Sequence, residues 1–220
     1  MSVLEKLKLK QQIFSEKEKK FLEFLNGNEN YKNNFRFFYV YSKANKELLY
    51  SMFEGLLKEM IIVDFDNYSL IIYHNKERVI LHNYLDTLSE DFSIKMGIFE
   101  GFLVNKDNNC LFKDFIYLFE KINLSNVSYA SIRNLILDFD LTKEERKILK
   151  DIVLNKYLKD NQFMKFLYAL FENNLNVSKT AKNVFMHRNT VNNKLASFEN
   201  DTTLVLQNFK DAIVVYELLK

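Results

Sequence analysis

The chain has 220 residues, a formal net charge of +2, 48% hydrophobic and 27% charged residues, which is the composition of a folded protein with one or two domains. One cysteine and three histidines exclude an intramolecular disulfide and a Cys/His zinc site, and four glycines leave no glycine-rich phosphate loop. No apolar run approaches the roughly 18 residues of a membrane span, and the charged start MSVLEKLKLKQQ is no signal peptide. We therefore expect a cytoplasmic protein with no metal, no cofactor and no membrane partner.

In the first part of the chain we predict a helix followed by alternating strands and helices. Residues 1–26 are predicted to be helical, with Ser15 and Glu18 as a capping box. Hydrophobic periodicity then predicts strands at 35–41, 61–65, 69–74 and 93–100 and helices at 46–60, 78–88 and 110–122. The order β-α-β-β-α-β is typical of a ferredoxin-like sheet with helices on one face.

From about residue 128 onward the strand signals cease. We predict a helix at 128–138, and Thr142 with Glu145 forms a second capping box at the start of another helix. The tail from 161 is helical throughout. The expected fold class is α+β, divided into a helical segment 1–30, an α/β domain 31–125, connecting helices 126–160 and an all-α domain 161–220.

Residues 162–198 have the pattern of a helix-turn-helix. A first amphipathic helix ends at Asn173–Asn174, and Asn176 can cap a short second helix at 177–184. A tight connection at 185–187 leads to a third helix at 188–198, which buries Val191, Leu195 and Phe198. A short helix, a three-residue turn and a helix with a polar start define this motif. The alternative from spacing alone is a helical hairpin with a solvated polar face.

The polar residues of this segment suit DNA. Arginine can bind guanine, asparagine can bind adenine, and threonine can bind a phosphate or a base edge. Between 176 and 200, four basic residues stand against Glu199 alone, an excess that favours phosphate contacts. His187 either caps the third helix or contacts phosphate. We predict base contacts by Arg188, Thr190, Asn192 and Asn193, phosphate contacts by Lys179, Lys182, His187 and Lys194, and further contacts by Ser178 and Asn189.

The motifs Asn176-Val-Ser-Lys-Thr-Ala181 and Met186-His-Arg-Asn-Thr190, followed by Leu195, closely resemble the C-terminal helix-turn-helix of PucR-type (CdaR-like) regulators of sugar-diacid and purine catabolism. The resemblance implies a bacterial, cytoplasmic transcription factor that is not an enzyme, acts as a homodimer and binds double-stranded DNA. It also implies a degenerate GGDEF-like domain upstream, for dimerisation or for sensing an unidentified small-molecule effector. The chain departs from the family at Asn192 and Asn193, where basic or aromatic residues are usual, and near Leu175, where glycine is usual.

Other functions are less well supported by the residues. Asp64 and Asp66 stand where a GGDEF domain carries its signature, but the Gly-Gly pair and the acid after the first strand are missing, so we expect no cyclase activity. A nucleotide-processing enzyme is disfavoured for the same reason. A protein-interaction or signal-receiving module with a vestigial helix-turn-helix remains the alternative. Cys110 is either a redox sensor or an inert thiol, and the aromatic strand 35–41 is either core or a base-stacking platform.

Overall fold

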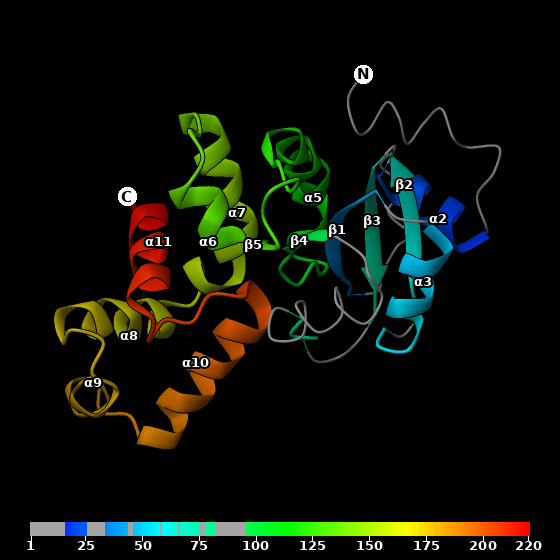
Figure 1. Ribbon diagram of the computed structural model, residues 1–220. Helices are drawn as coiled ribbons and strands as arrows, with labels where there is room; N and C mark the ends of the chain where they lie inside the picture. The colour runs from blue at the N-terminus through cyan, green and yellow to red at the C-terminus, as the bar shows by residue number, and fades with distance from the viewer. Residues whose placement is uncertain are drawn as a thin grey trace. The chain divides into compact units, whose positions relative to one another are not determined.

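The chain divides into two compact units, Met1–Ser131 and Ile132–Lys220, which are coloured from blue to green and from green to red in Figure 1. The computed structural model describes residues 16–25, 34–43, 46–57, 59–65, 67–74, 78–81 and 96–220. The first unit holds a β-sheet with helices, and the second is helical.

The first unit is built on a five-stranded mixed sheet with the strand order β2-β3-β1-β4-β5. The central strand β1 runs antiparallel to both β3 and β4, β2 runs antiparallel to β3, and β5 runs parallel to β4. The strands are β1 (Arg36–Ser42), β2 (Ile61–Phe65), β3 (Tyr68–Tyr73), β4 (Met96–Glu100) and β5 (Tyr129–Ser131). The helices of this unit are α2 (Glu16–Leu25), α3 (Lys46–Glu54), α5 (Asn109–Ile116) and the 3-10 helix η1 (Tyr117–Lys121).

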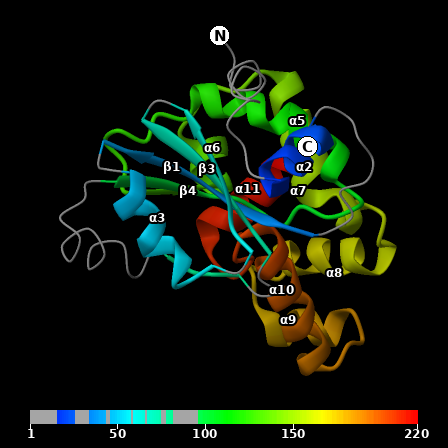
Figure 2. The same ribbon diagram turned by 90° about the vertical axis from the view of Figure 1, so that its right-hand side faces the viewer.

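Both faces of the sheet are buried, as the alternating residues of β1 show. Phe38 and Val40 join one cluster with the apolar side chains of α3. Phe37 and Tyr39 point to the opposite face, where Phe37 contacts the ring of Phe112 in α5 and Tyr39 stacks on Phe119 in η1. Figure 2 shows the sheet between α3 and α5. The prediction of helices on one face is therefore wrong, because an almost wholly apolar strand needs cover on both sides.

Most of the predicted elements of this unit are confirmed within one or two residues. The predicted helix 46–60 ends at Glu54, where a turn bonded back to Phe53 O begins. Residues 78–81 are not helical, which corrects the start of the predicted helix 78–88; its remainder lies outside the described residues, as do Ser15 and 93–95. The predicted helix 110–122 is α-helical only as far as Ile116 and continues as η1.

The strand β5 was not predicted, and it replaces the first turn of the helix expected at 128–138. The N–H of Ile98 in β4 donates to Ser128 O at 3.0 Å and starts the pairing. Gly97 permits the close approach of the preceding loop, since a Cβ there would lie 2.2 Å from Leu124 O. The helix α6 (Ile132–Leu137) follows β5 directly.

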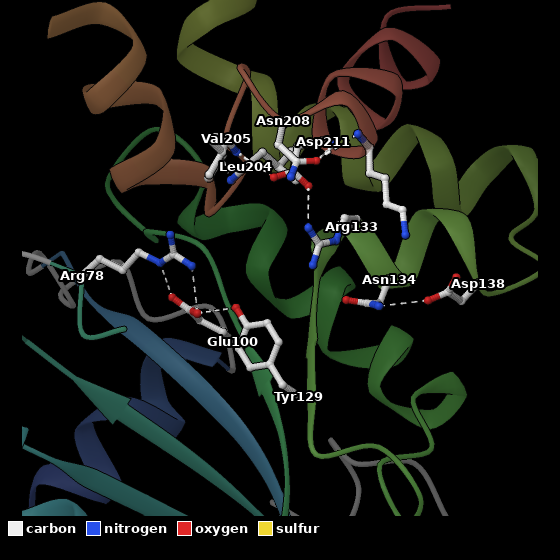
Figure 3. A network of polar contacts seen from close by, with 12 residues as sticks. Arg78, Glu100, Tyr129, Arg133, Asn134, Asp138, Leu204, Val205, Asn208 and Asp211 are labelled. Carbon is white, nitrogen blue, oxygen red and sulfur yellow. Dashed lines mark hydrogen bonds and ion pairs between the residues drawn. The ribbon is translucent and has the colours of Figure 1, made fainter. Parts of the chain in front are cut away.

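A buried polar cluster ties two segments of the first unit to β4. Glu100 is buried and pairs with Arg78, whose Nη2 donates to Oε2 at 2.9 Å. The hydroxyl of Tyr129 in β5 donates to the same carboxylate (Figure 3). Burial and the adjacent Glu100 raise the pKa of Tyr129. This carboxylate therefore holds both β5 and residues 78–81 against β4.

The second unit consists of helices, and a polar side chain caps the start of each helix that follows α6. Besides α6 these are α7 (Lys143–Leu158), α8 (Asn161–Glu172), α9 (Val177–Asn183), α10 (Arg188–Thr202) and α11 (Phe209–Leu219). The predicted capping box of α7 is confirmed: Glu145 N donates to Thr142 Oγ1 at 3.2 Å, and Thr142 N donates to Glu145 Oε2 at 2.8 Å. The aromatic rings of Tyr157, Phe163 and Phe198 meet where α7, α8 and α10 pack together.

A buried carboxylate fixes the turn between α10 and α11. Asp211 is buried, and its Oδ2 accepts a hydrogen bond from Val205 N at 2.9 Å. Its Oδ1 lies 3.3 Å from Nη1 of Arg133, which belongs to α6 (Figure 3). A charge buried this deeply requires such partners, so Asp211 joins α6 to the start of α11.

Candidate nucleic-acid interface

The first helix of the predicted motif ends without a glycine. Asn174 and Leu175 follow α8 with φ values of 53° and 62°, a left-handed conformation that asparagine tolerates and leucine seldom adopts. The N–H of Leu175 donates to Leu170 O at 2.9 Å, and that of Asn174 donates to Phe171 O at 3.0 Å. These bonds close a Schellman-type end, so the chain turns here without the glycine that such ends usually contain.

The short helix α9 is held by residues of the Asn-Val-Ser-Lys-Thr-Ala run. The side chain of Asn176 accepts a hydrogen bond from Lys179 N at 2.9 Å and caps the helix, as predicted. Thr180 and Ala181 are buried, and the Thr180 hydroxyl donates to Asn176 O at 2.8 Å. The amide of Asn183 donates to Asn173 Oδ1 at 3.1 Å and ties the end of α9 to the end of α8.

His187 caps the helix α10. Its Nδ1 accepts a hydrogen bond from Asn189 N at 3.2 Å, so the predicted capping role is confirmed and the phosphate contact stays a prediction. An Nδ1 that accepts must carry no proton, so in the neutral ring the proton lies on Nε2. Val191, Leu195 and Phe198 are buried, as the sequence predicted, and they hold the inner face of α10 against the unit.

The outer surface of α9 and of the first turns of α10 is polar. Every predicted DNA-contacting residue except Lys194 is exposed, namely Ser178, Lys179, Lys182, His187, Arg188, Asn189, Thr190, Asn192 and Asn193. In Figure 1, α9 and the start of α10 form one end of the helical unit. All nine side chains are thus accessible, and they lie on two adjoining helices of the same unit, α9 and α10, and at the cap of α10.

Lys194 differs from the rest of the set. Its side chain is only 20% exposed, and its Nζ lies 3.9 Å from Asp160 Oδ2. The same ammonium lies 6.0 Å from the centroid of the Phe163 ring, within cation–π range. Lys194 therefore faces the start of α8, where a carboxylate offsets its charge.

Sequence reasoning missed the polar anchor that positions the C-terminal half of α10. The hydroxyl of Tyr157 in α7 donates to Asp201 Oδ2 at 2.7 Å and lies 3.2 Å from Ser197 O. Lys156 also pairs with Asp201. Burial and the Asp201 carboxylate raise the pKa of Tyr157. No local pattern reveals a pair separated by more than 40 residues, so the sequence offered no signal for it.

The other candidate sites have structural partners. Asp64, at the position of the GGDEF signature, accepts a hydrogen bond from Ser69 Oγ at 2.6 Å and another from Tyr50, and it lies 3.4 Å from Lys46 Nζ. Its oxygens are thus engaged within the unit. Asp66 and His82 lie outside the described residues, Cys110 is exposed at the start of α5, and Nδ1 of His74 lies 3.0 Å from Glu59 O.

The described residues contain neither a metal-binding cluster nor a membrane-spanning helix. No group of three or more His, Cys, Asp or Glu side chains in that part of the chain could hold a metal ion. None of the helices found there is both long and apolar enough to cross a membrane.

The geometry of α8, α9 and α10, with two capped helices joined by a tight turn, is that of a helix-turn-helix domain. Residues 163–220 match the PucR C-terminal helix-turn-helix domain. This match covers most of the second unit and agrees with the motifs around Asn176 and His187, which resemble the same helix-turn-helix.

Two further proteins match this chain at low identity. The chain is 24% identical over 145 residues to YxkF, an uncharacterised protein of Bacillus subtilis strain 168. That alignment covers 62% of this chain and 48% of the relative, so the chain spans about half the length of the curated relative it matches. A crystal structure of a regulator of polyketide synthase expression from Bifidobacterium adolescentis shares 12% identity, with coverage of 100% of this chain and 96% of the other and a TM-score of 0.36. A TM-score this low does not establish a common fold.

Proposed function

We propose that this protein is a DNA-binding transcriptional regulator of the PucR type. The observation that carries the proposal is the exposed polar surface on α9 and the start of α10, in a domain that matches the PucR helix-turn-helix. Helices of this motif enter the major groove with their N-terminal residues toward the bases. Buried Val191 and Leu195 leave the polar side of α10 available for that role.

Each exposed residue has a role that follows from its chemistry. Arg188 donates to a guanine, and Asn192 and Asn193 pair with adenines. Lys179 and Lys182, both exposed on α9, bind phosphates. His187 caps α10 through Nδ1 and offers its Nε2 proton to a phosphate.

A homodimer fits the small charged surface of one domain. A single helix-turn-helix with few basic residues binds weakly, whereas a dimer reads two half-sites about one or two turns of the DNA helix apart. We propose double-stranded DNA as the partner and, from the resemblance to PucR-type regulators, the bacterial cytoplasm as the location.

We further propose that the first unit is a degenerate GGDEF-like, ferredoxin-like domain that serves dimerisation or effector sensing. The order β2-β3-β1-β4, with each neighbouring pair antiparallel, supports a split β-α-β arrangement. The helix α3 connects β1 to β2 as such an arrangement requires. The engaged oxygens of Asp64 support a domain without cyclase chemistry.

The test is binding to genomic DNA fragments by fluorescence anisotropy at several salt concentrations. Arg188→Ala should cost about 1–3 kcal/mol on the preferred fragments and little on the others. Arg146→Ala is the matched control, because it removes the same charge from an exposed site on α7. Equal binding of every fragment by all three proteins would contradict the proposal and favour a protein-interaction module.

A further inference from the structure

Phe185 is the most exposed large apolar side chain among the described residues, with 98% of its surface accessible. It lies in the turn between α9 and α10, two residues before His187. A phenylalanine ring in this position contributes almost no buried area to the domain. Its presence is therefore not explained by packing within the unit.

The backbone at Phe185 is also unfavourable for a side chain. Its φ is 54°, the left-handed region in which glycine is preferred. Met186 N donates to Ala181 O at 2.9 Å, and Phe185 N donates to Lys182 O at 3.2 Å. These two bonds are those of a Schellman motif with Phe185 at the position that glycine usually occupies. Phe185 thus carries backbone strain and solvent exposure together.

Strain of this kind at a surface turn points to a function outside the fold. Phe185 is flanked by exposed Lys182 and Arg188, which stand on the proposed DNA-contacting surface. An aromatic ring cannot bond a phosphate, but it can pack on an apolar group. In the major groove, the 5-methyl group of thymine is the apolar feature that base pairs present.

We propose that Phe185 packs against the 5-methyl group of a thymine in the major groove and so adds a preference for thymine beside the bases read by α10. This inference rests on the proposed DNA-binding function and deepens it. Arg188 and the exposed asparagines read hydrogen-bonding edges, which leaves the thymine methyl to an apolar side chain. Phe185 is thus a specificity residue, although the sequence pattern alone placed it in the turn that connects two helices.

The test begins with duplexes selected by the wild-type full-length chain from a random-sequence library. The tightest duplex is then prepared with deoxyuridine in place of each thymidine in turn, which removes only the methyl group. Phe185→Gly is the main variant, because glycine accepts the left-handed backbone and the domain should melt at a higher temperature. Phe209→Ala is the control, because it truncates another exposed phenylalanine of the same unit, at the start of α11.

The inference predicts that deoxyuridine at one position weakens wild-type binding about fourfold, the worth of one buried methyl group. Phe185→Gly should bind the thymidine duplex several-fold more weakly and show no further loss with deoxyuridine. Phe209→Ala should behave as the wild type in both respects. A selection repeated with Phe185→Gly should lose the thymine preference at that position.

Three outcomes overturn the inference. If Phe185→Gly binds the selected duplex as tightly as the wild type, Phe185 makes no contact. If the variant is weaker but deoxyuridine has no effect, the ring packs on the sugar and does not read thymine. If the wild type itself retains no DNA, the proposed function fails, and that result is distinct because Arg188→Ala then changes nothing either.

Discussion

The salt dependence of DNA binding distinguishes the two kinds of lysine in the helix-turn-helix. Lys182 is exposed on α9, whereas Lys194 lies beside Asp160 with 20% of its side chain exposed. Each phosphate contact contributes about −0.9 to the slope of log Kobs against log salt concentration. We therefore expect Lys182→Ala to make the slope shallower by about 0.9 for each bound domain, and Lys194→Ala to leave it unchanged.

The assay is anisotropy of a labelled duplex between about 50 and 200 mM salt, a range over which phosphate contacts change affinity strongly. Lys147→Ala is the control, since it removes an exposed lysine from α7 outside the proposed interface. Lys194→Ala should change only folding stability, by no more than about 1 kcal/mol for a partly exposed pair. An equal reduction of the slope by Lys182→Ala and Lys194→Ala would refute the assignment, because it would place both ammonium groups on phosphates.

Three substitutions test the framework that supports the site. Asp211→Ala removes a buried carboxylate that pairs with Arg133, and the free energy of unfolding measured in urea should fall by about 2–3 kcal/mol. A decrease below about 0.5 kcal/mol would contradict the structural role of Asp211. Gly97→Ala places a Cβ 2.2 Å from a backbone oxygen, so the melting temperature should fall strongly or no folded protein should form. A melting temperature equal to that of the wild type would refute the close approach. Burial and Asp201 raise the pKa of Tyr157 above its ordinary 10.0, so its neutral phenol stabilises the fold below pH 10 and this stabilisation is lost as the pH rises above that value. Tyr157→Phe should therefore lose less unfolding free energy than the wild type on alkaline titration. If the variant and the wild type have the same dependence of stability on pH, the effect is refuted.

The helix-turn-helix could be predicted closely because its signals are local. A cap lies within three residues of the helix it begins, and the buried positions of α10 recur every three or four residues. Asn176 and Thr142 therefore revealed the starts of α9 and α7 from sequence alone. The role of His187 stayed open at that stage, because capping and phosphate binding require the same exposed position.

The sheet could be predicted only in part, because its pairing depends on distant residues. The strands up to β3 have continuous apolar runs of their own, whereas the strand at Tyr129–Ser131 has three residues. It forms because β4 offers an unpaired edge and Gly97 admits the adjoining loop, and neither condition is visible in a window around Tyr129. For the same reason, the order of elements did not reveal that α5 packs on the face of the sheet opposite α3.

The positive-φ residues of the second unit are the feature of the helix-turn-helix that the sequence did not reveal. Asn174, Leu175, Phe185 and Thr203 all take left-handed conformations in this unit, and only the asparagine belongs to a residue type that adopts them readily. At Leu175 and Thr203 part of the side chain is covered, so packing can offset the strain. At Phe185 nothing within the domain offsets it, and the conformation is imposed by the hydrogen bonds that end α9. Since a sequence shows the residue and not its φ, the strain at exposed Phe185 becomes visible only in the folded chain, where Phe185 lies beside the residues proposed to read DNA.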